Sequence, residues 1–138
     1  MFHLLLYGPQ DPPKYVKFVP EVFHGVLFDE ISLGKLLKNV LSENVNGVVV
    51  SKRSLQDVIR ELCEKEIYVL HEKGLPIEEI EFGKDVVFVL GDHIGLPKKD
   101  EKFVMRYAKC KVSIGKLSYF TSHVITIINY ILDKRGVP

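Results

Sequence analysis

The sequence has few cysteines and no long apolar run. Its two cysteines, Cys63 and Cys110, are isolated and neither belongs to a CxxC motif, which favours buried thiols over a disulfide or a metal pair. No apolar run reaches the roughly 18 residues that a membrane span needs. The apolar run at residues 2–7 is too short for a secretory signal and has no basic residue before it. We therefore expect a cytoplasmic protein.

The sequence also lacks the common phosphate-binding and metal-binding motifs. Neither GxGxxG nor GxxxxGK[ST] occurs, which argues against a Rossmann dinucleotide fold and a P-loop NTPase. The pairs His71-Glu72 and Asp92-His93 have neither the i, i+4 helical spacing nor the cysteine partners of a zinc site, so we expect no metal. No serine stands in a GxSxG context, so hydrolase chemistry is weakly supported.

What is present fits one globular domain over residues 1–138. Hydrophobic residues make up 46% of the chain and charged residues 27%, and this length can bury a single core. The formal net charge is only +1, yet basic residues gather in one segment. They form either a solvated helix face or a basic rim beside a ligand site that holds a phosphate backbone. These residues are Lys98, Lys99, Lys102, Arg106, Lys109, Lys111 and Lys116.

Two stretches share one pattern, residues 86–97 (VVFVLGDHIGLP) and residues 112–122 (VSIGKLSYFTS). Each is an apolar strand that stops at a glycine, turns into a loop of small and polar residues, and is followed by a predicted helix. An α/β protein holds a small ligand at the carboxyl ends of such strands. Since no phosphate cradle is present, the ligand would be held by backbone amides and carbonyls around a neutral ring.

Strands and helices alternate along the chain, which predicts an α/β fold with a mostly parallel sheet and helices on both faces. Residues 15–19 fit a short edge strand, and residues 71–74 fit a turn. Ser54 and Asp57 form a capping-box pair before a helix. The predicted strands are 2–7, 15–19, 48–50, 67–70, 86–90 and 111–114, and the predicted helices are 32–44, the one after Ser54, 98–108 and 121–135, with Gly136 as the last stop.

The last predicted helix, residues 121–135, has apolar residues almost all the way round. Such a helix must be covered on more than one side. In a chain of this size the second cover is most simply another subunit, so we expect a homodimer. The apolar residues are Val124, Ile125, Ile127, Ile128, Tyr130, Ile131 and Leu132.

Two pairs of side chains suggest chemistry without deciding it. Asp92-His93 after the strand could act as an acid/base pair, or Asp92 bends the loop while His93 packs or faces solvent. Tyr119 and Phe120 could stack on a base, or they pack into the core where the loop folds back. Both alternatives stay open for each pair.

Several segments in order resemble one family. VFVLGDHIGLP, followed by VSIGKLSY, a serine and a final apolar helix ending in LDKRG, resembles the SPOUT class of RNA methyltransferases, and above all the archaeal tRNA pseudouridine N1-methyltransferases. GPQDPPKYVKF, VVVSKRSLQDVI and YVLHEKG look like further segments of that family. The resemblance covers nearly the whole chain, and the second half is its specific part.

The resemblance implies an S-adenosylmethionine-dependent homodimer with a C-terminal trefoil knot, at about residues 86–138. A knot departs from the rule that chains do not thread themselves. The cofactor would bind mainly to backbone groups of three loops, and Gly91 and Gly115 would permit close approach because they lack a Cβ. The implied cofactor-binding residues are Leu70, His71, Gly91, Ile114, Gly115, Lys116, Leu117, Ser118 and Val124.

The resemblance further implies methyl transfer to a pseudouridine or uridine in tRNA or rRNA. The sulfonium already activates the methyl group, so the enzyme places a ring nitrogen in line with it. An imide nitrogen must also lose its proton, for which Asp92, His93 and Asp11 are the candidates. A non-catalytic dimeric SPOUT-like module that binds RNA or a protein, and an unrelated α/β ligand-binding protein, are the alternatives.

The chain departs from the family pattern in three places. The family begins with an additional strand and helix before the proline-rich segment, which this sequence is expected to lack. Val124 stands where a cysteine is expected at the start of the last helix. The loop reads SIGK where SLGP is common, so Lys116 replaces a rigid proline.

Overall fold

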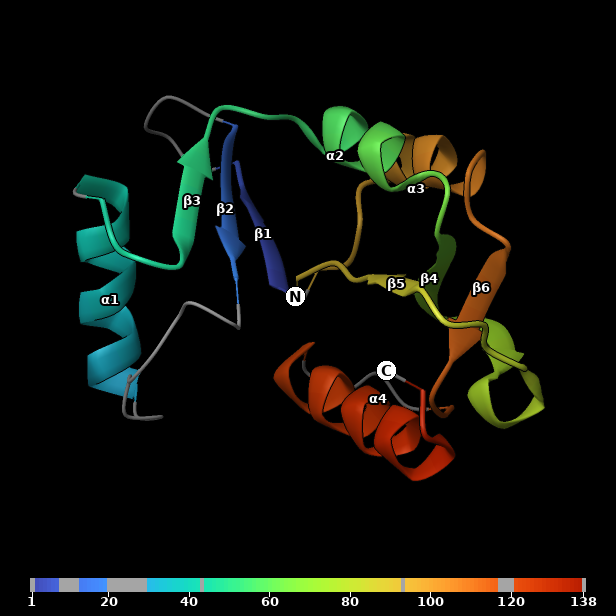
Figure 1. Ribbon diagram of the computed structural model, residues 1–138. Coiled ribbons are helices and arrows are strands. Elements are labelled where there is room, and N and C mark those ends of the chain that lie inside the picture. The colour runs from blue at the N-terminus through green and yellow to red at the C-terminus, as the bar shows by residue number, and fades with distance from the viewer. Residues whose placement is uncertain are drawn as a thin grey trace. The chain divides into compact units, whose positions relative to one another are not determined.

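The computed structural model describes residues 2–7, 13–19, 30–42, 44–92, 94–116 and 121–137. The chain divides into two compact units, Met1–Asp57 and Val58–Pro138, and each has one three-stranded sheet (Figure 1). The sheet of the second unit is parallel, as predicted. The sheet of the first unit is antiparallel, so the expectation of one mostly parallel sheet is wrong for that part of the chain.

The first unit is built on strands β1 (Phe2–Leu6), β2 (Lys14–Phe18) and β3 (Val48–Ser51). β1 and β2 pair antiparallel because the connection between them is too short for the crossover that parallel strands need. β3 pairs with the other side of β2, so β2 is the central strand and the predicted edge position is wrong. Its Tyr15 and Val16 are accordingly buried.

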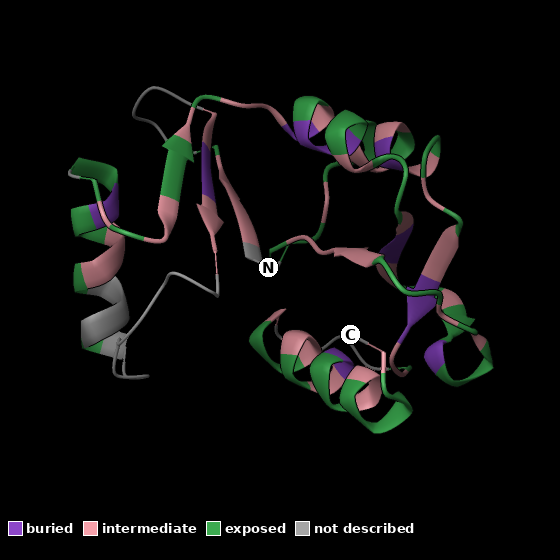
Figure 2. Cartoon of the chain, in the orientation of Figure 1, coloured by how far each residue is buried: buried purple, intermediate pink, exposed green. Residues whose placement is uncertain are grey.

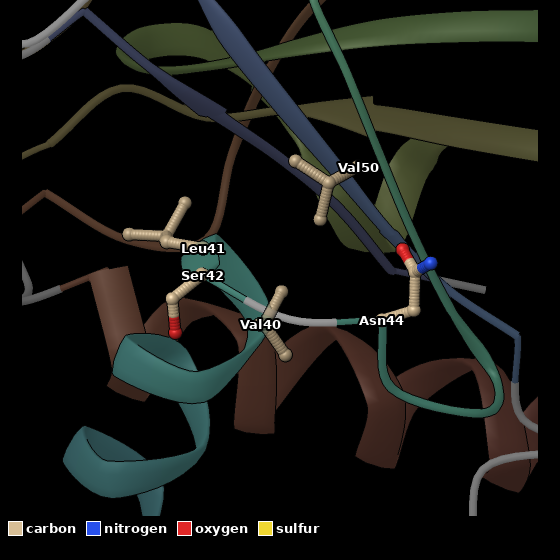
Figure 3. Close-up of a pocket in the computed structure, with 5 residues that line it drawn as sticks. All are labelled: Val40, Leu41, Ser42, Asn44 and Val50. Atoms are coloured by element: carbon tan, nitrogen blue, oxygen red, sulfur yellow. The ribbon is translucent and has the colours of Figure 1, made fainter.

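Helix α1 (Glu30–Ser42) completes the described part of the first unit and follows the predicted apolar spacing. Its Val40 is buried. A hollow of about 570 Å³ lies near the end of α1 and is lined by Val40, Leu41, Ser42, Asn44 and Val50 (Figure 3). None of these five residues has a titratable side chain, so the hollow presents no candidate for acid/base chemistry.

Helix α2 (Leu55–Leu62) begins at the capping box that the sequence predicted. The Asp57 amide donates to Ser54 Oγ at 3.2 Å, and the Ser54 amide donates to Asp57 Oδ2 at 3.1 Å. Each side chain thus satisfies a backbone N–H of the first turn that has no partner within the helix. The capping-box prediction is confirmed.

The second unit contains strands β4 (Glu66–Pro76), β5 (Val86–Val89) and β6 (Cys110–Ser113), in the order β5-β4-β6. A single 3₁₀ turn, η1 (Ile77–Glu79), follows β4. Helices α3 (Lys98–Met105) and α4 (Thr121–Arg135) follow β5 and β6 respectively. They lie on opposite sides of the parallel sheet (Figure 1), so the predicted cover on both faces is present in this unit.

The two faces of this sheet follow from side-chain alternation along each strand. Tyr68 of β4 and Val112 of β6 form a buried cluster with Ile77 of η1 and Ile128 of α4. The intervening residues Ile67 and Val69 are also buried, on the face toward α3. A strand covered on both faces reads as a continuous apolar run, which is why IYVL predicts a buried strand.

The segment after that run departs from the prediction. Residues 71–74 belong to β4 rather than to a turn, and the β4–β6 pairing shifts between Leu70 and Leu75, which marks a bulge. A Cβ added at Gly74 would lie 2.6 Å from the Lys111 carbonyl carbon and from the Val112 nitrogen. Glycine is therefore what lets the two backbones approach at the bulge.

The end of α4 agrees with the sequence. Gly136 has φ of +67°, and its amide donates to Asp133 O while the Val137 amide donates to Leu132 O. This is a glycine-ended helix of the expected kind.

One further expectation is wrong: Cys63 is exposed rather than buried, and both cysteines are free thiols. No helix in the described ranges combines the length and the apolar composition that a bilayer span requires.

Candidate functional site

A cavity of about 390 Å³ opens at the carboxyl ends of the three parallel strands. This is the position at which α/β sheets bind small ligands, and its volume lies within the range of ligand pockets, about 300–1,000 Å³. The middle of β4 at its bulge, the loop after β5, the end of β6 and the first residues of α3 and α4 all contribute. Its main lining residues are Leu70, His71, Glu72, Leu90, Gly91, Asp92, Leu96, Lys98, Glu101, Ser113, Ile114, Gly115, Thr121 and Val124.

The loop after β5 is held by a tight turn. The Gly95 amide donates to Asp92 O at 2.9 Å, and the Ile94 amide donates to Asp92 Oδ1 at 2.9 Å. Gly95 has φ of +90°, which an L side chain rarely adopts. Asp92 therefore bends this loop through both its carbonyl and its carboxylate, as the second of the two interpretations of Asp92 expected.

Gly91 is required by the same turn. A Cβ added there would lie 2.4 Å from the Gly95 carbonyl carbon and from the Leu96 nitrogen. Both obstacles are backbone atoms, which cannot move aside as a flexible side chain can. The backbone that approaches Gly91 is thus that of Gly95 and Leu96 in the same loop. This close approach shapes the wall of the cavity.

Thr121 connects the loop after β5 to the start of α4. Its Oγ1 donates to the Gly91 carbonyl oxygen at 2.9 Å. The two loops are thirty residues apart in the sequence, so this bond fixes one wall of the cavity against another.

The loop after β6 is held by Ser113, the last residue of the strand. Ser113 Oγ donates to Gly115 O at 2.8 Å and accepts from the Gly115 amide at 3.2 Å. The Ser113 residue is 8% exposed, so water competes little for these bonds. A buried hydroxyl that satisfies both groups of one residue determines the direction in which the chain leaves β6.

His71 lies in the bulge of β4 at the mouth of the cavity. Its Nδ1 accepts from the Lys73 amide at 3.0 Å. Since Nδ1 is the acceptor, the neutral ring carries its proton on Nε2. His71 thus contributes a ring nitrogen with a defined donor role to a site that is otherwise built largely from backbone.

Charged side chains of both signs line the cavity. Lys98 is exposed at the start of α3, and Glu101, one turn later, forms an ion pair with Lys111 of β6. Glu72 and Asp92 add two further carboxylates. The site therefore offers acidic side chains, one unpaired lysine among the described residues, and an apolar floor of leucine, isoleucine and valine.

The opposite, amino end of the sheet is closed by side chains. Glu66 Oε1 accepts from Lys109 Nζ at 2.5 Å, and Glu66 Oε2 accepts from the Gly83 amide at 2.8 Å and from the Tyr68 hydroxyl at 3.3 Å. The hydrogen bond from Lys109 is the largest cause that lowers the pKa of Glu66, and the same bond raises the pKa of Lys109. Burial is the main cause that raises the pKa of Tyr68.

The structure brings most of the predicted site residues to one cavity. Lys116 is exposed and is not among the lining residues. Asp11, His93, Leu117 and Ser118 lie outside the described residues, as do Tyr119 and Phe120. The predicted residues that line the cavity are Leu70, His71, Gly91, Asp92, Ile114, Gly115 and Val124.

Sequence reasoning missed several residues of this site, among them Thr121, Ser113 and Glu101. Thr121 and Ser113 act through backbone carbonyls that no sequence motif marks. Glu101 lies three residues after Lys98 on α3, and that spacing could have placed it at the same end of the helix. The roles of Thr121 and Ser113 could be recognised only from the way the loops pack in the structure.

The overall fold resembles a solved structure. The crystal structure of Archaeoglobus fulgidus Nep1 bound to S-adenosylhomocysteine superposes with a TM-score of 0.58 at 16% identity, covering 83% of this chain and 54% of that one. The present chain spans about half of the length of the Nep1 chain. This likeness defines the class of fold: a SPOUT-like α/β protein with a cavity at the carboxyl ends of parallel strands.

Sequence comparison then defines the family. Residues 1–137 match the family described as "Putative SAM-dependent RNA methyltransferase". Among curated relatives, the tRNA (pseudouridine(54)-N(1))-methyltransferases of Thermococcus onnurineus, Pyrococcus abyssi and Thermococcus gammatolerans are 39%, 40% and 42% identical over 98–99% of this chain and 73–74% of theirs. The chain belongs to this family of S-adenosylmethionine-dependent RNA methyltransferases, as the sequence motifs predicted.

The cavity fits the family's cofactor. Its apolar floor suits an adenine ring, and its backbone-lined loops offer amides and carbonyls without a phosphate cradle. S-adenosylmethionine carries a positive sulfonium and an ammonium group, for which the lining carboxylates are suitable neighbours. Lys98, which lines the same cavity, could pair with the cofactor's carboxylate.

Proposed function

We propose that this enzyme transfers a methyl group from S-adenosylmethionine to N1 of a pseudouridine in tRNA, at the position 54 that names its relatives. The observation that carries the proposal is the identity of about two residues in five with those enzymes over nearly the whole chain. The proposal would be contradicted if the methylated base were a uridine or if the substrate were an rRNA.

The proposed cofactor site is the cavity at the carboxyl ends of the parallel strands. The cofactor supplies a methyl group that its sulfonium already activates. Leu70, Ile114 and Val124 would pack against the adenine ring, and the backbone at Gly91 and Gly115 would form its hydrogen bonds. His71 would donate through Nε2 at the rim. Leu117 and Ser118 remain candidates from the resemblance.

The N1–H of pseudouridine must lose its proton for the ring nitrogen to attack the methyl carbon. Asp92 is a candidate base because it lines the cavity and is exposed. Oδ1 is occupied by the Ile94 amide, so the proton would be taken by Oδ2. His93 and Asp11 stay candidates on the resemblance alone. Positioning of the ring nitrogen in line with the methyl group would supply much of the rate.

Three further features belong to the proposal. The domain spans residues 1–138 with a trefoil knot near residues 86–138, which a crystal structure would test. The enzyme is a homodimer through α4, which carries exposed positions on much of its surface (Figure 2). In this helix Ile128 is buried and Tyr130 is 64% exposed. A monomer in sedimentation at micromolar concentration would contradict the dimer. The enzyme is cytoplasmic, and cell fractionation would test that location.

The decisive experiment uses two tRNA transcripts that differ only in pseudouridine or uridine at position 54. Cofactor with a tritiated methyl group is supplied, and the product is digested and its nucleosides identified by mass spectrometry. We expect N1-methylpseudouridine from the first transcript and no transfer to the second. Equal transfer to both transcripts, or transfer to neither while rRNA in a parallel reaction is methylated, would contradict the proposed target while leaving the family assignment intact.

A further inference from the structure

We propose that the outer face of α3 is the surface on which this enzyme holds the sugar-phosphate backbone of its RNA substrate next to the cofactor cavity. The inference rests on the proposed function, since it requires RNA to approach that cavity. It concerns four residues of one helix, called here the α3 basic stripe: Lys98, Lys99, Lys102 and Arg106.

The stripe follows from helix geometry. At about 100° per residue, these four positions fall within one arc of about 100° on the helix surface. Arg106 is the C-cap residue and keeps right-handed helical angles, so it continues the same arc. All four residues are exposed. Val104, which is fully buried, lies on the opposite side of the helix, so the stripe points away from the parallel sheet.

The acidic residues of α3 do not neutralise the stripe. Asp100 and Glu101 are half-buried and lie outside the basic arc. Glu101 already forms an ion pair with Lys111. Within the described part of the chain, Lys98, Lys99 and Lys102 form no ion pair, whereas the neighbouring Lys109 is paired with Glu66. Lys109 and Lys111 of this segment are thus paired with carboxylates, whereas the three lysines of the stripe are not, and Arg106 lies over the Phe103 ring at 5.9 Å from its centroid.

The stripe is continuous with the cavity. Lys98, its first residue, lines the cavity, and the remaining three lie up to about two turns further along the helix. Lysine and arginine residues three or four positions apart on a helix present neighbouring charges along one line. Such a line attracts a polyanion whose charges are also regularly spaced, and the attraction does not depend on base sequence.

The chemistry favours RNA over another partner. The substrate of the family is RNA, and the stripe begins where the reacting base must enter. Backbone contacts on α3 would thus fix the register of the strand, while the cavity receives one nucleotide from it.

The test compares two double variants that remove the same charge. Lys99→Gln/Lys102→Gln alters the stripe at residues that do not line the cavity. Lys65→Gln/Lys84→Gln alters two exposed lysines that stand one residue before β4 and two residues before β5, at the amino end of the sheet. Affinity for pseudouridine-containing tRNA is measured over a salt series, together with cofactor affinity by calorimetry and the steady-state constants.

We expect the stripe variant to lose about tenfold in tRNA affinity and to lower the slope of log K against log salt by about two, one for each phosphate contact. Its KM for tRNA should rise while kcat and cofactor affinity stay unchanged. The variant Lys99→Arg/Lys102→Arg should bind as the wild type does, because both charges remain. The control pair should leave affinity and slope unchanged.

Three results would overturn the inference, and they are distinguishable. If the wild type methylates tRNA but the stripe and control variants bind it equally well, the surface is wrong and the proposed function stands. If the wild type binds cofactor but no tRNA at any salt concentration, both are wrong. A loss in the stripe variant that Lys99→Arg/Lys102→Arg shares would show that the lysine side chains, rather than their charge, are required, and would also contradict the inference.

Discussion

The two ends of the parallel sheet are built by different means. At the amino end, Glu66 gathers Lys109, Tyr68 and the Gly83 amide in one network of side chains. At the carboxyl end, hydroxyl and carboxylate groups bind the backbone instead, from Thr121 to Gly91 O and within the Ser113–Gly115 loop. The amino end is thus held by a network that includes an ion pair, whereas a cavity opens at the carboxyl end.

This difference shows how the fold separates stability from function. A side-chain ion pair at an exposed sheet end contributes modestly and is weakened by salt. Short polar side chains that hold loop backbone leave amides and carbonyls in fixed positions around a cavity. Changes at the carboxyl end should therefore affect ligand binding, and changes at the amino end should affect stability and its dependence on pH.

The largest expected effect comes from Gly91→Ala. The new Cβ meets backbone atoms of Gly95 and Leu96 at 2.4 Å, so the turn must open and the cavity wall must shift. A displacement of about 1 Å can cost about a hundredfold in kcat/KM, and we expect a loss of that order together with weaker cofactor binding in calorimetry.

Gly83→Ala is the matched control at the amino end. There the new Cβ meets only the Glu66 side chain, with Oε1 at 2.9 Å, and a side chain can turn aside. We expect unchanged cofactor affinity and a small loss of thermal stability. Equal loss of activity in both variants would show that the two ends of the sheet are not functionally distinct.

Thr121→Val should have an intermediate effect. The substitution keeps the shape of the side chain and removes the donor to Gly91 O. One hydrogen bond contributes about 0.5–1.5 kcal/mol, so cofactor affinity should fall by between about twofold and tenfold, as calorimetry would measure.

Two variants control for this change. Thr121→Ser should restore the affinity because it restores the donor. Thr126→Val removes a hydroxyl that bonds only to Ser122 O within α4 and should bind cofactor as the wild type does. If Thr121→Val also binds normally, the connection between the two loops is not needed for the site.

The smallest expected effect is that of Glu66→Gln on stability. The pKa of Glu66 is lowered in the folded protein, mainly by the hydrogen bond from Lys109. A lowered pKa stabilises the fold above the unfolded-state value of 4.5, and this stabilisation is lost as the pH falls through the folded-state pKa. The variant should therefore melt below the wild type at neutral pH, and the difference should vanish in acid.

Melting curves over a pH series would test this, with cofactor affinity as the second measurement. High salt should also reduce the difference, because both partners are exposed to solvent. A difference in melting temperature that persists well below pH 4.5 would contradict the ionic origin of the effect. A loss of cofactor affinity would show that the amino end influences the cavity.

Local features of the fold were predictable from the sequence because their causes are local. Three features depend on residues within a few positions of one another. They are the Ser54–Asp57 capping box, the glycine end of α4 and the end of β5 before Gly91. The cavity's place followed as well, since the carboxyl ends of parallel strands meet at one edge of a sheet.

Features that depend on strand pairing were not predictable in this way. The central position of β2 is determined by β3, some thirty residues later, and the bulge in β4 is determined by β6. The turn-like sequence HEKG therefore lies within β4 as a bulge, because the residues on either side of it pair with β6.

The sequence by itself determined the family, the alternation of strands and helices in the second unit, and the two glycine-ended loops, because motifs and periodicity are written along the chain. Three relations were decided only by the tertiary structure. The backbone of Gly95 and Leu96 lies too close to Gly91 for a side chain there, and Thr121 joins this loop to α4. The lysines of α3 form one stripe without ion pairs among the described residues. These relations join residues distant in sequence or opposed across a helix, and distances of that kind exist only after the chain has folded.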